Sequence, residues 1–173
     1  MEKIFYVDKN TFPSSDEAIQ AILAKYFGIT DARINRSKNG KPYLAQELGL
    51  YLSVSHTNEM LFVGISDKEL GIDAERLSRE KRYAAILKKF PLEEQAEICC
   101  NEDFLQHWTA KEAAIKYLGG TLAQELKKLA FVNGTLSHTE KALPQICELR
   151  IEDTLLSICC ERDFSHAEII RWI

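Results

Sequence analysis

The sequence has no long apolar run, no linker or low-complexity tract, and no glycine-rich phosphate loop of the Walker or Rossmann type. Nothing in its 173 residues approaches the roughly 20 apolar residues that cross a bilayer. The first residues also lack the apolar core of a signal peptide. Hydrophobic residues make up 46% of the chain and charged residues 28%, which excludes a disordered protein. We therefore expect a globular, cytoplasmic, monomeric protein with no membrane partner.

An excess of basic residues is also absent. The formal net charge is −4, and neither half of the chain is basic overall, so nucleic acid is not expected as a partner. The sequence has no Cys-x-x-Cys pair, because four of its five cysteines form two adjacent pairs. Neighbouring cysteines favour neither a relaxed disulfide nor a zinc site, and we expect all five to be buried, reduced thiols. They are Cys99, Cys100, Cys147, Cys159 and Cys160.

The first seventy residues predict one helix among several strands. Ser14 and Glu17 form a capping-box pattern ahead of an apolar helical stripe, and Gly28 can end this helix. Asn39-Gly40 predicts a two-residue hairpin turn. Strands are expected at residues 3–7, 32–36, 41–44, 50–55, 61–65 and 70–73.

Helical spacing begins after Ser78. We expect a helix around Tyr83–Phe90 that Pro91 terminates, a short helix at 92–99, and a longer one that Asn101 caps and Gly119 ends. Strand-like runs return at 129–132, 145–151, 154–160 and 168–172. This order predicts an α+β fold in which helices pack on antiparallel sheets.

Two acidic residues follow the apolar start of the strand expected near residue 70. In an extended strand Asp73 and Glu75 point to the same face. Neighbouring carboxylates repel unless a cation lies between them, and a hard divalent ion such as Mg2+ is the usual reason for such a pair. The alternative is a strand end that leaves the sheet for solvent.

A helical stripe contains the second candidate group. Trp108, Glu112 and Lys116 are spaced at i, i+4 and i+8, so they lie along one side of the predicted helix. Taken alone, the stripe is explained by an aromatic anchor and a solvated Glu–Lys pair. Ser55-His56, at the end of a strand, is likewise explained by a structural hydrogen bond.

In combination these motifs resemble the Sfp-type 4'-phosphopantetheinyl transferases, over residues 16–131. The matching segments, in order, are Gly40–Pro42, Leu52–Thr57, Gly71–Glu75 and Trp108–Lys116. The resemblance implies transfer of the phosphopantetheine arm of coenzyme A to a serine of an apo acyl or peptidyl carrier protein, with release of adenosine 3',5'-bisphosphate. It also implies a pseudo-dimer of two similar α+β halves, here residues 1–70 and 71–173, with coenzyme A in the cleft between them.

The resemblance also implies roles for particular residues. Asp73, Glu75 and Glu112 would hold Mg2+, although Mn2+ suits the same oxygen ligands. Glu112 is the expected general base for the carrier's serine, and Lys116 the expected catalytic cation. The residues expected to contact coenzyme A are Lys41, Ser55, His56, Lys111 and Lys116.

Four departures from the family pattern are visible. The N-terminal half is shorter than in many members, and the arginine common near the first helix has no counterpart among Asp16–Ala21. Ser53 stands where asparagine is common, and Thr57 where serine is common. The nucleotide contacts from the first helix are therefore open.

The segment Arg76–Lys89 is rich in lysine and arginine and has one glutamate. It is interpreted either as a solvated surface or as a docking site for an acidic carrier protein. A rival interpretation of the whole chain is a non-catalytic relative that binds coenzyme A or carrier proteins. A different Mg2+-dependent nucleotide enzyme has no support, because no phosphate loop is present.

Overall fold

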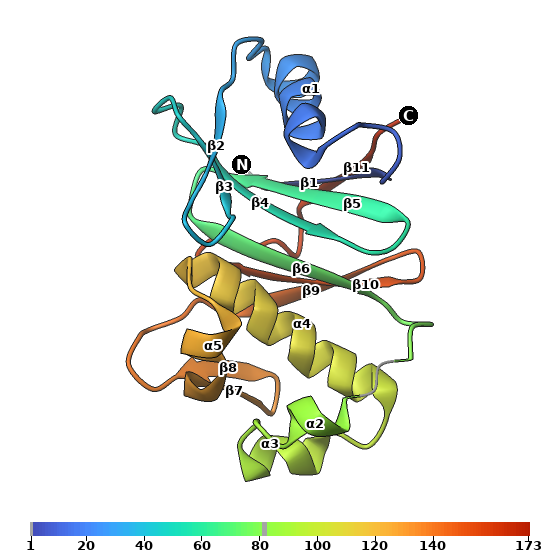
Figure 1. Cartoon of the computed structure of the whole chain (residues 1–173), viewed down its shortest axis with the longest axis vertical. Helices are drawn as coiled ribbons and strands as arrows, with labels where there is room; N and C mark the ends of the chain where they lie inside the picture. Colours follow the sequence, from blue (N-terminus) through green and yellow to red (C-terminus); the bar gives the residue numbers. More distant parts are fainter. Residues whose placement is uncertain (1, 81–82) are drawn as a thin grey trace.

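The computed structural model describes residues 2–80 and 83–173, which stack in layers (Figure 1). Helix α1 (Ser15–Phe27) covers one face of a first sheet, and a second sheet packs against the other face. Helix α4 (Asn101–Leu118) lies across the far side of the second sheet. The expected α+β class, with helices on antiparallel sheets, is confirmed.

The first sheet has the order β11-β1-β5-β4, and the second has the order β6-β10-β9. Two hairpins, β2–β3 and β7–β8, lie beside them. All pairs are antiparallel except β1 with β11. The strands are β1 (Glu2–Asp8), β2 (Ile34–Arg36), β3 (Pro42–Leu44), β4 (Tyr51–His56), β5 (Met60–Ser66), β6 (Leu70–Arg76), β7 (Leu129–Val132), β8 (Thr135–His138), β9 (Ile146–Ile151), β10 (Thr154–Cys160) and β11 (Glu168–Arg171).

Short helical segments complete the second half of the chain. They are α2 (Ala84–Leu87), α3 (Leu92–Glu97), α5 (Leu122–Glu125) and a 3-10 turn at Leu126–Lys128. Their aromatic and aliphatic side chains pack against the first part of α4, where Phe104 stacks on Tyr83 with ring centroids 4.4 Å apart. No helix in the described ranges is long and apolar enough to cross a membrane.

Side-chain alternation along the strands produces the layers. Ile4 of β1 packs between the two sheets, whereas Phe5 and Val7 pack under α1. In β6 the even-numbered residues Leu70, Ile72 and Ala74 belong to the core between the sheets. The odd-numbered residues of β6 therefore face α4, where the functional side chains lie.

The chain passes from the first sheet to the second between β5 and β6, close to the expected boundary at residue 70. The last strand then returns to the first sheet, because β11 pairs in parallel with β1. Ile170 and Trp172 pack against the core under α1. The end of the chain thus completes the sheet with which the chain begins.

The expectation that all five cysteines are buried is wrong for two of them, and a third, Cys147, is only half-buried. Cys99 and Cys100 are exposed at the start of α4, whereas Cys159 and Cys160 are buried. Cys100, and not Asn101, is the N-cap of α4: its sulfur accepts from the Asp103 N–H, and the Asp103 carboxylate accepts from the Cys100 N–H at 3.0 Å. A helix start at the surface exposes its cap, which explains the difference.

Candidate functional site

A close contact between β6 and α4 fixes the position of the candidate site. A Cβ atom on Gly71 would lie 2.0 Å from the Ala113 carbonyl oxygen and 2.3 Å from the Tyr117 nitrogen, so only glycine lets the helix backbone approach the strand this closely. Asp73 and Glu75 follow Gly71 on the same face of β6. Both carboxylates are therefore directed toward α4 and are buried.

Asp73 has one satisfied oxygen and one unsatisfied oxygen. Its Oδ1 accepts from the Ser55 hydroxyl at 2.9 Å and from Lys116 Nζ at 2.8 Å. Its Oδ2 is buried and has no hydrogen-bond partner in the described part of the chain. A buried carboxylate oxygen without a donor is costly, and a bound cation or an ordered water would remove that cost.

Glu75 belongs to β6, and Glu112 belongs to α4. Glu75 forms an ion pair with Arg79, with 3.2 Å between Arg79 Nη1 and Glu75 Oε2. Glu112 is half-buried on α4, one turn before the Lys116 that contacts Asp73. Within residues 2–80 and 83–173, no three His, Cys, Asp or Glu side chains are gathered closely enough to hold a metal.

The donor set nevertheless fits a hard divalent cation. Asp73 offers an open oxygen, and Glu75 adds a second carboxylate on the same strand face. In the structure these two carboxylates are paired with the protein's own cations, Lys116 and Arg79. Binding a metal here would require those ion pairs to loosen.

Two serines of β4 join the sheets at this point. The Ser53 hydroxyl accepts from the Ile72 N–H at 3.0 Å, and the Ser55 hydroxyl accepts from the Ala74 N–H at 3.1 Å. Ser55 also donates to Asp73. Ser55 is buried, so it orients a carboxylate instead of lining an open cavity. The small Ser53 hydroxyl thus bonds the backbone of β6. Residue 53 is the position at which the family that the sequence resembles commonly has asparagine.

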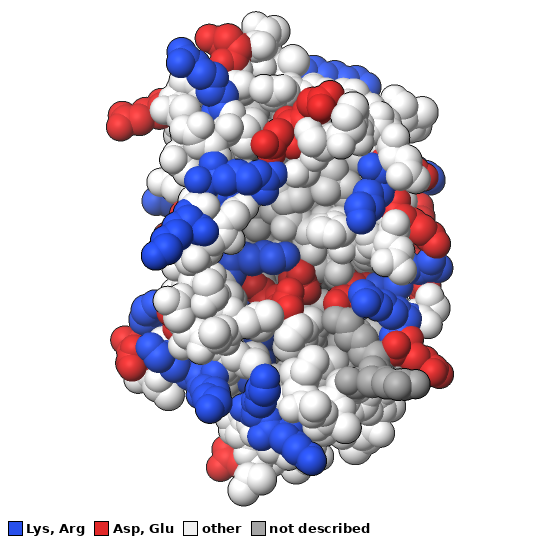
Figure 2. All heavy atoms as spheres, viewed as in Figure 1, with Lys and Arg blue, Asp and Glu red and all other residues white. Residues whose placement is uncertain are grey.

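A cavity of about 300 Å3 opens between β4, the β2–β3 hairpin and the end of α4. It is linked to Asp73 through Lys116, which lines the cavity and contacts the Asp73 carboxylate. Four basic side chains line it: Arg36, Lys41, His56 and Lys116. The structure thus brings together three of the residues expected to contact coenzyme A, namely Lys41, His56 and Lys116. Figure 2 shows this side of the molecule, with a hollow at mid-height where basic and acidic atoms meet.

His56 is exposed at the end of β4. Partial burial lowers the pKa of its imidazole below the usual value, and the positive charges of Lys9 and Lys116 add to this effect. Asp73 and Glu75 oppose the shift. His56 is therefore neutral at pH 7 and lies within electrostatic range of the carboxylate pair.

Lys41 and Lys116 approach the cavity from opposite halves of the chain. Lys41 donates to Glu69 and, at 2.8 Å, to the Leu70 carbonyl oxygen. Lys116 contacts Asp73 and lies 3.4 Å from the Val54 carbonyl oxygen. Both amines are thus held at the cavity wall by acceptors that an anionic ligand could replace.

Arg36 is a site residue that the sequence did not reveal. It donates to Asp16, to the Ser15 hydroxyl at 2.7 Å and to the Gly40 carbonyl oxygen at 2.9 Å. The first helix has no arginine of its own, but Arg36 arrives beside its first turn from β2. The sequence signal that could have indicated this role is the position of Arg36 just before the hairpin turn, where it pairs with Pro42.

The structure places Lys111 away from this group. Its side chain is fully buried, and Nζ lies 2.7 Å from Glu94 Oε2 and 2.6 Å from the Leu129 carbonyl oxygen. Burial lowers the pKa of this amine, and the Glu94 carboxylate opposes the shift. Lys111 therefore ties α4 to α3 and β7, and it does not line the cavity.

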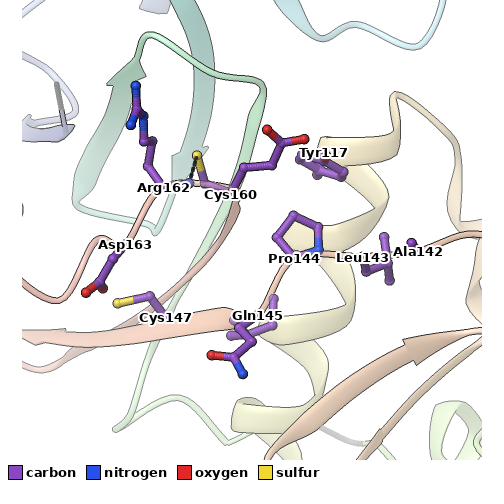
Figure 3. Close-up of a pocket in the computed structure, with 11 residues that line it drawn as sticks. Tyr117, Ala142, Leu143, Pro144, Gln145, Cys147, Cys160, Arg162 and Asp163 are labelled. Atoms are coloured by element: carbon purple, nitrogen blue, oxygen red, sulfur yellow. Dashed lines mark hydrogen bonds between the residues drawn. The ribbon is translucent and has the colours of Figure 1, made fainter.

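A separate cavity of about 500 Å3 lies between β9, the end of β10 and Tyr117 of α4 (Figure 3). None of the site residues expected from the sequence lines it. Burial raises the pKa of both of its thiols, Cys147 and Cys160, which makes them weak nucleophiles. We therefore place the candidate active site at the cavity lined by Lys41, His56 and Lys116.

Known proteins resemble this chain along most of its length. A 4'-phosphopantetheinyl transferase AcpT from Escherichia coli is 28% identical over 145 residues, covering 79% of this chain and 70% of the relative. A 4'-phosphopantetheinyl transferase from Bacillus subtilis is 24% identical over 158 residues, covering 83% of this chain and 70% of the relative.

A third relative, the 4'-phosphopantetheinyl transferase HetI from Nostoc sp., is 26% identical over 147 residues, which are 78% of this chain. The match spans 60% of the length of HetI. The family model of the 4'-phosphopantetheinyl transferase superfamily matches residues 69–166, which include β6 and all of α4. Because this match covers more than half of the sequence, the chain belongs to the 4'-phosphopantetheinyl transferase superfamily.

Proposed function

We propose that this protein transfers the 4'-phosphopantetheine arm of coenzyme A to a serine of an apo acyl or peptidyl carrier protein and releases adenosine 3',5'-bisphosphate. One observation carries the proposal: Lys41, His56 and Lys116 line one cavity, and Lys116 also contacts Asp73, whose buried Oδ2 has no hydrogen-bond partner among the described residues. Groups suited to phosphates are thereby joined, through Lys116, to an anion suited to a metal. The three relatives named above support the same activity.

Coenzyme A would bind with its phosphates in this cavity. Arg36, Lys41 and His56 would hold the nucleotide phosphate, since each carries donors that suit phosphate oxygens. An adjoining groove of about 590 Å3 shares Lys41 and Pro42 with the cavity and carries the exposed rings of Tyr43 and Tyr51. Its apolar surface suits the flat base of the nucleotide.

Mg2+, or Mn2+, would be held by Asp73, Glu75 and Glu112. When bound, the metal would neutralise charge on the diphosphate as its phosphoanhydride bond breaks. The protein's own part is to keep Asp73 in place through Ser55, and to supply Lys116, which exchanges its Asp73 contact for a phosphate oxygen. Lys111 has no part in the proposed phosphate contacts, because it is buried against Glu94.

Glu112 is the proposed general base. The oxygen of the carrier's serine attacks the phosphorus that bears the pantetheine arm, and the bond to the adenosine bisphosphate breaks. The serine proton passes to the Glu112 carboxylate, either directly or through water. Glu112 suits this role because it comes from α4 and not from the strand that carries the other two carboxylates.

Two further features belong to the proposal. Residues 1–70 and 71–173 would act as two halves that enclose the ligand within one monomer, with β11 reaching back to complete the first sheet. The acidic carrier would dock on the segment Arg76–Lys89. The exposed cations of this segment include Arg79, Lys88 and Lys89, while Lys81 and Arg82 lie outside the described residues.

Incubation of the protein with coenzyme A and a panel of apo carrier proteins tests the function. With Mg2+ present, mass spectrometry should detect addition of one phosphopantetheine group to at least one carrier, and chelation of the metal should prevent it. If no carrier is modified under any condition while coenzyme A still binds, the chain is a non-catalytic binding relative and the proposed transfer is wrong.

A further inference from the structure

The turn of the β2–β3 hairpin is joined to the end of α4 at the wall of the proposed coenzyme A cavity. The side-chain amide of Asn39, in this turn, donates to the Gly119 carbonyl oxygen at 2.8 Å. Both residues line the cavity, and Figure 1 shows the hairpin reaching the end of the helix. Asn39 belongs to the first half of the chain and Gly119 to the second, so this hydrogen bond links the two halves beside the cavity.

The hairpin is fixed at its base and depends on polar contacts at its tip. Ile34 and Leu44 face each other at the base, and both pack against the core under α1. At the tip, residues 38–40 are exposed. The two strands form a separate two-stranded sheet, and a two-stranded hairpin alone is marginally stable in water. The contacts of the tip therefore determine how closely the hairpin lies against α4.

The hydrogen bond between Asn39 and Gly119 lies where the two proposed ligand hollows meet. Gly119 lines both the cavity of about 300 Å3 and the adjoining groove of about 590 Å3, and so do Lys41 and Pro42. A ligand with its phosphates in the cavity and its base in the groove passes these residues. The cavity is also at the lower end of the roughly 300–1,000 Å3 that ligand sites occupy. Entry of so long a ligand therefore requires the hairpin and the helix end to part.

We propose that Asn39 is the latch of a gate: its hydrogen bond to Gly119 breaks when coenzyme A enters or leaves, and forms again when the hairpin closes. The inference rests on the proposed function and adds to it the route by which the ligand reaches the cavity. Asn39 is a positioning residue, because it acts on the hairpin and not on the reacting phosphorus.

The latch can close with and without ligand. Lys41, two residues along the hairpin, donates to the Leu70 carbonyl oxygen, and an anionic ligand would replace that acceptor. Asn39 differs, because its amide carries two N–H donors and the bond to Gly119 needs only one. Loss of the latch should therefore favour the open gate equally in the free and in the bound protein. Entry and exit both become faster, and the Kd for coenzyme A stays the same.

Coenzyme A binding to the wild type, Asn39→Ala and Asn35→Ala, measured by surface plasmon resonance, tests the gate. Loss of one exposed hydrogen bond should raise both the association and the dissociation rate constant about two- to tenfold in Asn39→Ala, with the Kd unchanged. Asn39 has no positive φ, so alanine fits its backbone. Asn35 is the matched control, because it is an exposed residue of β2 outside both hollows, and its variant should keep the wild-type rates.

Unchanged rate constants in Asn39→Ala would overturn the inference. Faster dissociation with a weaker Kd and unchanged association would overturn it too, because Asn39 would then hold coenzyme A directly. Equal changes in Asn39→Ala and Asn35→Ala would reflect general loosening of the hairpin and not a latch.

Wild-type transfer, assayed by mass spectrometry in parallel, separates the gate from the function. If the wild type binds coenzyme A and modifies a carrier while Asn39→Ala shows no change in rates, only the gate is wrong. If the wild type neither binds coenzyme A nor modifies a carrier, the proposed function is wrong as well.

Discussion

The unpartnered oxygen of Asp73 is the residue-scale feature from which the proposed mechanism starts. Ser55 and Lys116 fix its neighbour Oδ1, so the carboxylate cannot turn to satisfy Oδ2 without losing both bonds. Glu112 belongs to α4, which packs on the strand of Asp73, and His56 at the end of β4 interacts electrostatically with this carboxylate. Glu112 is assigned to proton transfer and His56 to ligand binding, so the two residues can be tested separately.

Glu112→Gln should abolish most of the transfer while leaving coenzyme A bound. Removal of a general base costs about 10²–10⁴-fold in kcat, and the amide keeps the size of the side chain. Stopped-flow or mass-spectrometric rates, with a Kd for coenzyme A from calorimetry, measure the two effects separately. Glu102→Gln, on the same helix but paired with Arg150 at the surface, is the control. Undiminished turnover in Glu112→Gln would remove this residue from the mechanism.

Coenzyme A binding should take up a proton at His56. In the unliganded protein the pKa of the imidazole is lowered below its usual value of 6.5, so the ring is neutral at pH 7, and a bound phosphate would raise that pKa. Affinity should therefore increase as the pH falls from 7 through 6.5 in the wild type, and change less in His56→Gln. Calorimetry in buffers of different ionisation enthalpy measures the uptake, and equal uptake in both proteins would contradict the assignment.

The lowered pKa of His56 also makes the stability of the folded protein depend on pH. The unfolded chain binds the His56 proton at about pH 6.5, before the folded protein does. The contribution of the neutral imidazole to stability is therefore complete above pH 6.5 and decreases as the pH falls through that value. Because His56 is exposed, this effect is small beside the effect on binding.

At the scale of elements, the crossing of β6 and α4 positions the chemistry. Gly71 permits the contact, and Asp73 from the strand then meets Lys116 from the helix. The aromatic contacts of Tyr83 and Phe90 with Phe104 hold the segments before α4 against the same helix. The site therefore depends on one backbone approach and on the packing that maintains it.

Gly71→Ala should destabilise the protein and move the site residues of β6 away from those of α4. The added methyl group meets backbone atoms, which cannot turn aside, so we expect a loss of about 1–3 kcal/mol in the free energy of unfolding together with loss of transfer. Urea denaturation measures the stability. Gly134→Ala, which meets open space but has a φ of 70°, should cost about 1–2 kcal/mol of local strain and keep transfer. Full activity in Gly71→Ala would contradict the proposed role of the contact.

Regular local signals made many elements predictable from the sequence. As expected, Ser14 caps the start of α1 and the left-handed Gly28 ends it. The strand that was expected to hold Asp73 and Glu75 on one face is present as β6. The hairpin at Asn39-Gly40 forms with a longer loop, because Ser37 and Lys41 close it. The strand β8 was not predicted, since Thr135–His138 has little apolar content.

Tertiary contacts account for what the sequence could not reveal. Lys111 and Lys116 look equivalent in the motif, but five residues turn a helix by about 140° beyond one full rotation, so one amine reaches Glu94 and the other reaches Asp73. Arg36 reaches the cavity only because the β2–β3 hairpin folds beside α1. Neither orientation is visible without the packing of distant segments.

At the scale of the whole molecule, the basic groups used in the proposal lie on two separate surfaces. The basic side chains of the proposed coenzyme A cavity lie between the two halves, whereas Lys88 and Lys89 are exposed beside α2. The net charge of −4 means that attraction of an acidic carrier depends on local patches and not on the total. The docking segment is therefore a property of the arrangement of charges over the folded chain.

Charge reversal at Lys88 and Lys89 should weaken the use of an acidic carrier. Unfavourable charge slows encounter, so we expect the KM for the carrier to rise several-fold at low salt and the difference to shrink as salt screens it. Steady-state kinetics at two salt concentrations measure this effect. Lys25→Glu, on α1 at the opposite end of the molecule, is the control (Figure 1). A KM unchanged by the reversal would mean that the segment is only a solvated surface.

The measurement that tests the central claim most directly is the rate of phosphopantetheine transfer by Asp73→Asn, compared with the wild type at saturating Mg2+ and coenzyme A. Asparagine keeps the shape of the side chain but removes the charge that the open oxygen would offer to a metal. We predict a fall of about 100-fold or more, with the fold retained by circular dichroism. Transfer at the wild-type rate, with the same dependence on Mg2+, would contradict the assignment of this site.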